Sequence, residues 1–192
     1  MYKRQEYCPY CAAQRWPLVV ALSRFGTFSD VGSTHSAADD VYPNTASLSF
    51  HGSTYTSKYL SFTGVEMTTN KAVSGQYEPL DALSAADQMT FDTYNRPPYV
   101  PGQAGAIPFI DIAGRYVSVG ASYSPELLDG LTHAEIAAAL EDADSDLAQA
   151  IDGAANLYTA AICQATGQQP RAVCTSPGVT AAAAQLRHQP TS

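Results

Sequence analysis

The sequence predicts an α/β domain, and two stretches lead to this prediction. Residues 12–22 read as a helix that directly follows a Cys-x-x-Cys pair, and residues 105–119 read as a β-hairpin. Strand-forming segments lie between these stretches, and helical patterns follow the second one. We expect a single domain over residues 1–178, with its core over about 6–142 and a C-terminal helical extension over about 143–178.

Composition argues against several classes of protein. The chain has 192 residues, of which 45% are hydrophobic and 15% are charged, as is usual for a folded globular protein. Its net charge is −8 and its few basic residues are scattered, so we expect no nucleic-acid partner. The sequence holds no run of about 18 apolar residues, the length that a membrane-spanning helix needs.

The Cys8-Pro9-Tyr10-Cys11 stretch carries the clearest chemistry. A cysteine at the first turn of a helix lies against unpaired backbone N–H groups and the positive end of the helix dipole. Both favour the thiolate, so we expect the pKa of Cys8 to lie below the value of ~8.5 of a free cysteine. Cys11 lies one turn deeper, where it can attack a mixed disulfide on Cys8. Pro9 has the fixed φ that suits a helix start.

From its spacing alone, the cysteine pair has two other interpretations. It can be half of a zinc site, or it can be a structural disulfide. Redox folds with such a pair at a helix start usually place a buried apolar strand before it, and residues 1–5 show no such strand. We therefore expect the first strand to be missing and the chain to be an N-terminally truncated fragment.

The first half of the chain then alternates between helix, loop and strand. Pro17 lies inside the first helix and is expected to kink it or to tighten its early turns. Residues 27–46 are expected to form a solvated acidic loop. His35, Asp39 and Asp40 in this loop are interpreted as exposed side chains rather than metal ligands, because their spacing does not recur. We expect neither a metal nor a cofactor.

Strand patterns cover residues 47–51, 54–62 and 64–68. Ser84 then opens a helix that ends before Pro97. This helix is interpreted as an insertion ahead of the hairpin, and a structural cap is its simplest role.

Ile107 and Pro108 open the predicted hairpin, whose two strands are separated by a tight Ala-Gly turn. The very start of a strand is the position at which a β-structure tolerates proline.

Helix-start signals follow the hairpin at Ser124, Thr132 and Ser145, and the last of these helices has one buried face. His133 is interpreted as a surface residue. Residues 179–192 are expected to form a disordered tail.

The remaining cysteines are Cys163 and Cys174, and pairing within each local pair is the simplest arrangement of the four. A disulfide that closes such a short loop would stabilise the end of the chain by about 3 kcal/mol and would indicate an oxidising compartment. Two buried reduced thiols remain the alternative.

Two stretches resemble signatures of the thioredoxin-like superfamily. Glu6-Tyr7-Cys8-x-x-Cys11 is similar to the Glu-Trp-Cys-x-x-Cys of thioredoxins, with tyrosine in place of tryptophan. Gly105-Ala-Ile107-Pro108 is similar to the Gly-Ile-Pro that carries their cis-proline, and the Cys-Pro-Tyr-Cys centre is shared with glutaredoxins.

This resemblance implies a thioredoxin-like fold, in which a central mixed sheet is flanked by helices. It implies that Cys8 is the attacking thiolate and Cys11 the resolving thiol. It also implies that Pro108 is a cis-proline facing the pair, and that Ile107 offers backbone groups to a substrate strand. With Pro9 and Tyr10, these two residues form the expected substrate-binding set.

Four longer segments resemble a narrower group, domain-of-unknown-function family 929, which is found in archaea and actinobacteria, often behind an N-terminal membrane anchor. The segments are Cys-Pro-Tyr-Cys-Ala-Ala-Gln-Arg-Trp, Ser-Phe-His-Gly-Ser-Thr-Tyr-Thr-Ser-Lys-Tyr-Leu, Ile-Pro-Phe-Ile-Asp-Ile-Ala-Gly and Gly-Ala-Ser-Tyr-Ser-Pro. This resemblance implies an extracytoplasmic location, membrane contact only through an anchor outside this chain, and a Cys163–Cys174 disulfide. It implies no established substrate.

The leading hypothesis is a monomeric thiol–disulfide oxidoreductase that acts on protein cysteines and exchanges electrons with a redox partner protein. Zinc is the weaker interpretation, because the second cysteine pair is widely spaced and lies at the far end of the chain. The alternative function is a redox-inactive thioredoxin-like module in which the Cys8–Cys11 bond is structural. A third is a glutaredoxin-like enzyme that uses glutathione, which is less favoured because the scattered basic residues offer no carboxylate-binding cluster.

Overall fold

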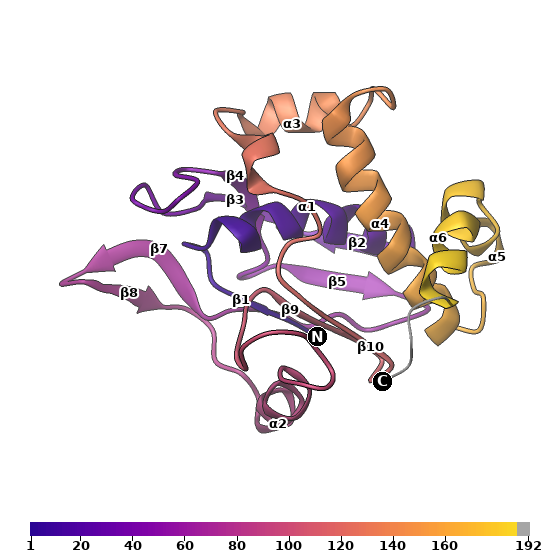
Figure 1. Ribbon diagram of the computed structural model, residues 1–192, viewed down its shortest axis with the longest axis horizontal. Helices are drawn as coiled ribbons and strands as arrows, with labels where there is room; N and C mark the ends of the chain where they lie inside the picture. The colour runs from indigo at the N-terminus through magenta and orange to yellow at the C-terminus, as the bar shows by residue number, and fades with distance from the viewer. Residues whose placement is uncertain (188–192) are drawn as a thin grey trace.

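The computed structural model describes residues 1–187 and is built around a four-stranded mixed sheet with the order β10-β9-β1-β6. β1 (Tyr2–Arg4) runs parallel to β6 (Gly64–Glu66) and antiparallel to β9 (Phe109–Ile112). β9 and β10 (Tyr116–Val119) form the predicted hairpin. The α/β class and the mixed sheet are thus confirmed (Figure 1).

The expectation that the strand ahead of the cysteine pair is missing is wrong. β1 is an inner strand, and its Tyr2 pairs with Gly64 on one side and Ile110 on the other. Sequence reasoning missed β1 because Arg4 reads as a surface residue. The Arg4 side chain is in fact fully buried, in an ion pair with Glu66 of the neighbouring strand.

Alternation along β1 directs its side chains to two helical layers (Figure 1). The Tyr2 hydroxyl donates to the Cys11 carbonyl of α1 (Pro9–Ser23) on one face. Lys3 faces the other way, with its ammonium 3.4 Å from the ring centre of Phe91 in α2 (Ala85–Tyr94). The Phe91 ring also meets Phe109 of β9 edge-on. The helix expected as a structural cap therefore covers the second face of the sheet.

α1 continues through Pro17, although proline removes one bond of the helix ladder. The carbonyl that loses its partner is that of Ala13, four residues earlier. The Tyr123 hydroxyl donates to this carbonyl at 2.8 Å. A side chain from beyond the hairpin thus replaces the backbone donor that Pro17 lacks.

Three two-stranded ribbons lie outside the central sheet. They pair β2 (Gly26–Ser29) with β5 (Thr54–Ser57), β3 (Gly32–His35) with β4 (Ala46–Ser49), and β7 (Thr68–Val73) with β8 (Gln76–Pro79). The prediction of a solvated acidic loop over residues 27–46 is therefore wrong at β2, at β3 and at Ala46, where β4 begins. β2 and β3 are rich in glycine, serine and threonine, so their sequences lack the apolar alternation by which strands are recognised. Gly26 is needed where β2 meets β5, because a Cβ there would lie 2.4 Å from the Thr56 carbonyl oxygen.

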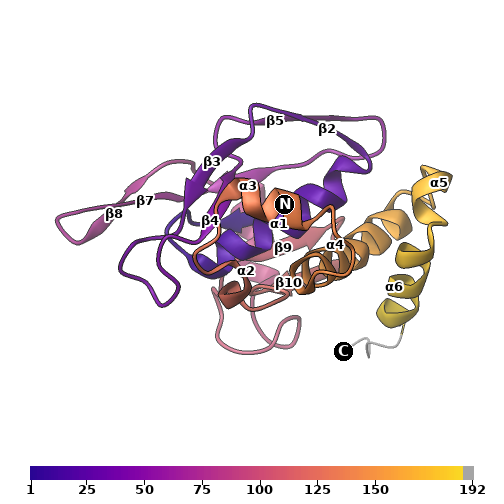
Figure 2. The ribbon, with the colours of Figure 1, turned by 90° about the horizontal axis from the view of Figure 1, so that it is seen from above.

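The C-terminal part is helical and begins with a 3-10 turn, η1 (Pro125–Leu128), followed by α3 (His133–Ala139) and α4 (Asp146–Ala165). Their starts at Ser124, Thr132 and Ser145 agree with the predicted N-caps. α5 (Arg171–Cys174) and α6 (Pro177–Arg187) follow and pack beside α4 (Figure 2).

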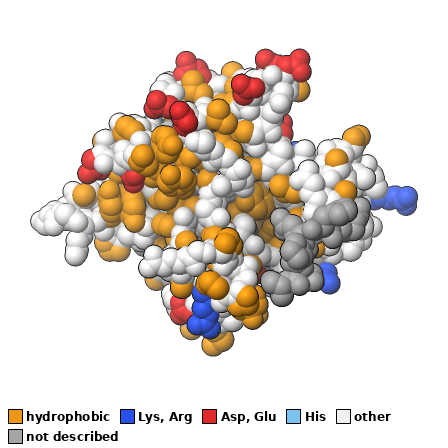
Figure 3. Space-filling view, in the orientation of Figure 1, with side chains coloured by type: hydrophobic (Ala, Val, Ile, Leu, Met, Phe, Trp, Pro, Cys, Tyr) orange, Lys and Arg blue, Asp and Glu red, His pale blue; other side chains and the backbone are white. Residues whose placement is uncertain are grey.

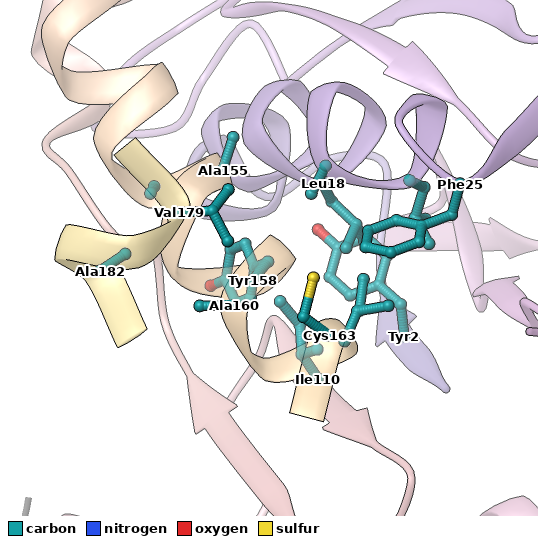
Figure 4. Packing of buried hydrophobic residues seen from close by; sticks show 14 of the residues in the cluster. Tyr2, Leu18, Phe25, Ile110, Ala155, Tyr158, Ala160, Cys163, Val179 and Ala182 are labelled. Atoms are coloured by element: carbon teal, nitrogen blue, oxygen red, sulfur yellow. The ribbon is translucent and has the colours of Figure 1, made fainter. Parts of the chain in front are cut away.

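The predicted disordered tail is wrong as far as residue 187, and residues 188–192 lie outside the described part. Val179 and Ala182 of α6 are buried in the same hydrophobic cluster as Leu18 of α1 and Tyr158 of α4 (Figure 4). Sequence reasoning missed α6 because its residues are mostly small and lack a strong apolar stripe. Small residues instead allow close contact: a Cβ on Gly178 would lie 2.7 Å from the Asn156 amide.

Cys163 of α4 and Cys174 of α5 form a disulfide with a Cα–Cα distance of 5.6 Å, which confirms the expected pairing. Cys163 is also part of the hydrophobic cluster that joins the extension to the sheet (Figure 4). Within residues 1–187, no helix combines the length and apolar character needed to cross a membrane.

Candidate dithiol site

The cysteine pair lies at the edge of the sheet where β1 and β6 end. Both strands point their carboxyl ends toward this edge, and β1 leads directly into α1 through residues 5–8. In α/β sheets, the carboxyl ends of parallel strands are the usual place for a functional site.

Cys8 is the N-cap of α1, and its side chain replaces one missing backbone bond. The Cys11 N–H donates to Cys8 Sγ at 3.3 Å, and Pro9 occupies the first helical turn as predicted. Both cysteines are reduced in this structure. The Cys8 residue is 7% exposed and Cys11 is 0% exposed, so of the two only Cys8 has any contact with solvent.

The environments of the two thiols move their pKa values in opposite directions. A hydrogen bond from the Cys11 side chain lowers the pKa of Cys8, helped by backbone N–H groups and the charge of Arg15 and opposed by burial. Burial raises the pKa of Cys11 well above its ordinary value, and the neighbouring Cys8 adds to this. These opposite shifts favour the thiolate at Cys8 and the thiol at Cys11.

A buried charge cluster lies beneath the pair, and sequence reasoning did not find it. Arg15, one turn beyond Cys11, donates to Glu66 through Nε at 3.1 Å and Nη2 at 2.8 Å. Arg4 Nε lies 2.7 Å from the same carboxylate, but not in hydrogen-bond geometry. The Arg4 guanidinium also packs over the rings of Tyr2 and Phe50.

This cluster holds two positive charges and one negative charge. Burial alone would raise the pKa of Glu66, but Arg15 and Arg4 hold it below its ordinary value, so the group is a carboxylate. Arg15 also donates to the Gln5 carbonyl, in the turn that leads to Cys8, and to the Ser47 hydroxyl of β4. The net positive charge favours thiolates, and these bonds fix the turn that carries Cys8.

The hairpin entry lies at the same edge of the sheet. The Ile107–Pro108 peptide bond is cis, Pro108 is buried and Ile107 is half-buried. Continuing the β1–β9 register by one residue places Pro108 opposite Arg4, at the end of β1 that leads to Cys8. Asn95, for which the sequence gives no signal, is buried and donates to the Ala106 carbonyl at 2.7 Å, which holds this entry in place.

His133 contacts His35 and the backbone of strands β3 and β4. His133 is half-buried rather than on the surface as expected. Its Nε2 lies 2.7 Å from the Ser47 carbonyl oxygen and 3.0 Å from that of Thr34. Its ring meets the ring of exposed His35 edge-on. Within residues 1–187, no three His, Cys, Asp or Glu side chains gather as metal ligands.

The second cysteine pair is not part of the site. Cys163 and Cys174 join α4 to α5 at the end of the molecule opposite the β7–β8 ribbon (Figures 1 and 2). Tyr10 is 43% exposed and meets Tyr42 edge-on, so its ring lies on the surface beside the pair.

Comparison with known proteins gives one match. No curated protein and no solved structure matches the chain. The family described as domain of unknown function (DUF929) matches residues 1–164, which include the cysteine pair, the central sheet and most of α4. The chain therefore belongs to the DUF929 family.

Proposed function

We propose that this protein is a thiol–disulfide oxidoreductase that acts on the cysteines of other proteins. The observation that carries the proposal is the asymmetry of the cysteine pair. Cys8 caps the helix, is 7% exposed and has a lowered pKa, whereas Cys11 is 0% exposed and has a raised one. Neither a structural disulfide nor a zinc site requires its two cysteines to differ in pKa and exposure.

In the reducing direction, the Cys8 thiolate attacks one sulfur of a substrate disulfide. The Cys8–substrate bond forms, the substrate S–S bond breaks and the first substrate thiolate leaves. Cys11 then loses its proton, and its sulfur attacks Cys8 and releases the second substrate thiolate. Two electrons pass to the substrate, and the protein is left with a Cys8–Cys11 disulfide, which a dithiol partner protein must reduce. The oxidising direction is the reverse.

A thioredoxin-like fold is part of the proposal. The resemblance implies a strand that leads into the Cys-x-x-Cys helix and a hairpin that a cis-proline opens. β1 with α1, and Ile107–Pro108 with β9–β10, agree with this implication. The position of Pro108 opposite the end of β1 is consistent with its proposed role, with Ile107, in holding a substrate strand beside Cys8.

We further propose that the protein works outside the cytoplasm. The Cys163–Cys174 disulfide supports this location, because structural disulfides persist in oxidising compartments. Protein substrates are favoured over glutathione because the few basic residues are scattered along the sequence, and the loop next to Cys8 carries Asp39 and Asp40.

Cysteine substitutions test the reaction. Cys11→Ser is expected to accumulate mixed disulfides with protein substrates, because the resolving thiol is missing, and Cys8→Ser is expected to abolish turnover. The double variant Cys163→Ala/Cys174→Ala is the matched control and retains turnover. If Cys11→Ser turns over as fast as the wild type, the dithiol mechanism is wrong.

A further inference from the structure

Two segments far from Cys8 in the sequence flank it in space. The Ala37 N–H donates to the Tyr7 carbonyl at 2.8 Å, which attaches the loop of residues 36–45 to the residue before Cys8. The Glu6 N–H donates to the Thr68 carbonyl at 3.0 Å, which attaches the β7–β8 ribbon to the residues just before Cys8. Both segments therefore lie beside the residues that lead into Cys8.

Four tyrosines lie where these segments meet the stretch around Cys8, and we call Tyr7, Tyr10, Tyr42 and Tyr77 the tyrosine rim. Tyr7 stacks on Tyr77 of β8 with ring centres 4.0 Å apart and planes 10° apart. Tyr10 meets Tyr42 of the loop edge-on at 6.1 Å. One ring of each pair therefore comes from the active-site stretch and the other from a flanking segment.

The surface around the rim is apolar and exposed. Val41, next to Tyr42, is 65% exposed, and Val73, at the end of β7, is 57% exposed. Hydrophobic side chains gather on the side of the molecule where β3, β4 and β7 lie, with acidic side chains at the edges of the patch (Figure 3).

The flanking segments also carry an excess of negative charge. They contain the carboxylates of Asp39, Asp40 and Glu78 against the single ammonium group of Lys71. After the effect of burial, the charges of Asp39 and Asp40 raise the pKa of Tyr77, which places both carboxylates near the rim. The Asp40 carboxylate is oriented by the backbone N–H of Val41 at 2.6 Å.

Aromatic faces beside carboxylates attract cations and repel acids. A lysine or arginine side chain gains from both the ring quadrupole and the ion pair, whereas a glutamate meets two like charges. We infer that the preferred substrates are cysteine-bearing polypeptide segments with a lysine or arginine near the reacting cysteine, bound by the tyrosine rim with Asp39 and Asp40. This inference rests on the proposed function and names its substrate class.

Two peptides that differ only in charge test the preference. Each contains one cysteine in a mixed disulfide with thionitrobenzoate, flanked on both sides by lysine in one peptide and by glutamate in the other. Reduced protein is mixed with each peptide and thionitrobenzoate release is followed. The rates are divided by those with dithiothreitol, which corrects for the intrinsic reactivity of each peptide.

The lysine peptide is expected to react at least about threefold faster, the ratio that one or two exposed ion pairs provide. The ratio should fall toward one in about 1 M salt, where charges are screened within about 3 Å. It should also fall in Asp39→Asn/Asp40→Asn. The control Asp142→Asn/Asp144→Asn removes the same charge from exposed positions between α3 and α4 and keeps the ratio.

The rim has its own pair of variants. Tyr77→Phe keeps the ring and should keep the ratio, whereas Tyr77→Leu removes the aromatic face and should lower it. Equal rates for both peptides, or faster reaction of the glutamate peptide, would overturn the inference and leave the proposed function standing. If neither peptide reacts faster with wild-type protein than with Cys8→Ser, the proposed function itself fails.

Discussion

Arg15 of α1 donates two hydrogen bonds to the Glu66 carboxylate of β6, and both side chains are completely buried. The pair ties the helix that carries both cysteines to the edge of the central sheet. Because Arg4 shares the same carboxylate, positive charge remains beneath the thiols. Charge in such a buried position acts on neighbouring groups with little screening by water.

This cluster can be perturbed in two opposite directions. Arg15→Met removes a positive charge and is expected to raise the pKa of Cys8, whereas Glu66→Gln removes a negative charge and is expected to lower it. The measurement is the pH dependence of Cys8 alkylation. Arg15→Lys keeps the charge but loses the paired hydrogen bonds to Glu66, so it should shift the pKa of Cys8 less than Arg15→Met does. Shifts of the same sign in Arg15→Met and Glu66→Gln would show that the cluster acts only through structure.

Stability in acid should depend on Glu66. Its pKa is lower in the folded protein, so the unfolded chain takes up its proton first as the pH falls. The stabilisation by Glu66 is complete above the unfolded pKa and is lost as the pH falls through the folded one. Urea unfolding across this range is therefore expected to lose more stability in the wild type than in Glu66→Gln. Parallel pH profiles would contradict the assignment.

The hydrogen bond from the Tyr123 hydroxyl to the Ala13 carbonyl should stabilise the fold more when residue 17 is proline than when it is alanine. Tyr123→Phe leaves the Ala13 carbonyl unpaired, at an expected cost of about 1–3 kcal/mol in the free energy of unfolding. In a Pro17→Ala background the helix supplies its own N–H, so the same substitution should cost clearly less. A double-mutant cycle by urea unfolding measures this coupling, and strictly additive costs would rule it out.

The Cys163–Cys174 disulfide should affect stability and not reactivity. Cys163→Ala/Cys174→Ala is expected to lower the free energy of unfolding by about 3 kcal/mol, the chain-entropy value for a short loop. Cys8 alkylation should keep its rate, because the bond lies at the other end of the molecule. A large change in Cys8 reactivity would mean that the extension supports the site.

Local signals in the sequence predicted the helices well. Ser84, Thr132 and Ser145 cap the helices that they were expected to open, because a cap needs only the next few residues. Cys8 was likewise identifiable as a helix N-terminus with its partner one turn on.

Features that depend on distant partners were missed. β1 is an inner strand in which Arg4 contacts Glu66 and Phe50, and neither contact is visible in residues 1–5. The tyrosine rim likewise depends on Tyr42 and Tyr77, which turns and ribbons bring beside Cys8 from later in the chain. Contacts between residues far apart in the sequence leave no periodic pattern in the sequence of either partner.

Cys8 is expected to be a reactive thiolate and Cys11 a protected thiol. Reduced protein is alkylated with iodoacetamide from about pH 4 to about pH 10, and each labelled cysteine is identified by peptide mass mapping. We predict that Cys8 is labelled with a midpoint below the ~8.5 of a free thiol, while Cys11 stays unlabelled in the folded protein. A Cys8 midpoint at or above that value would contradict the account.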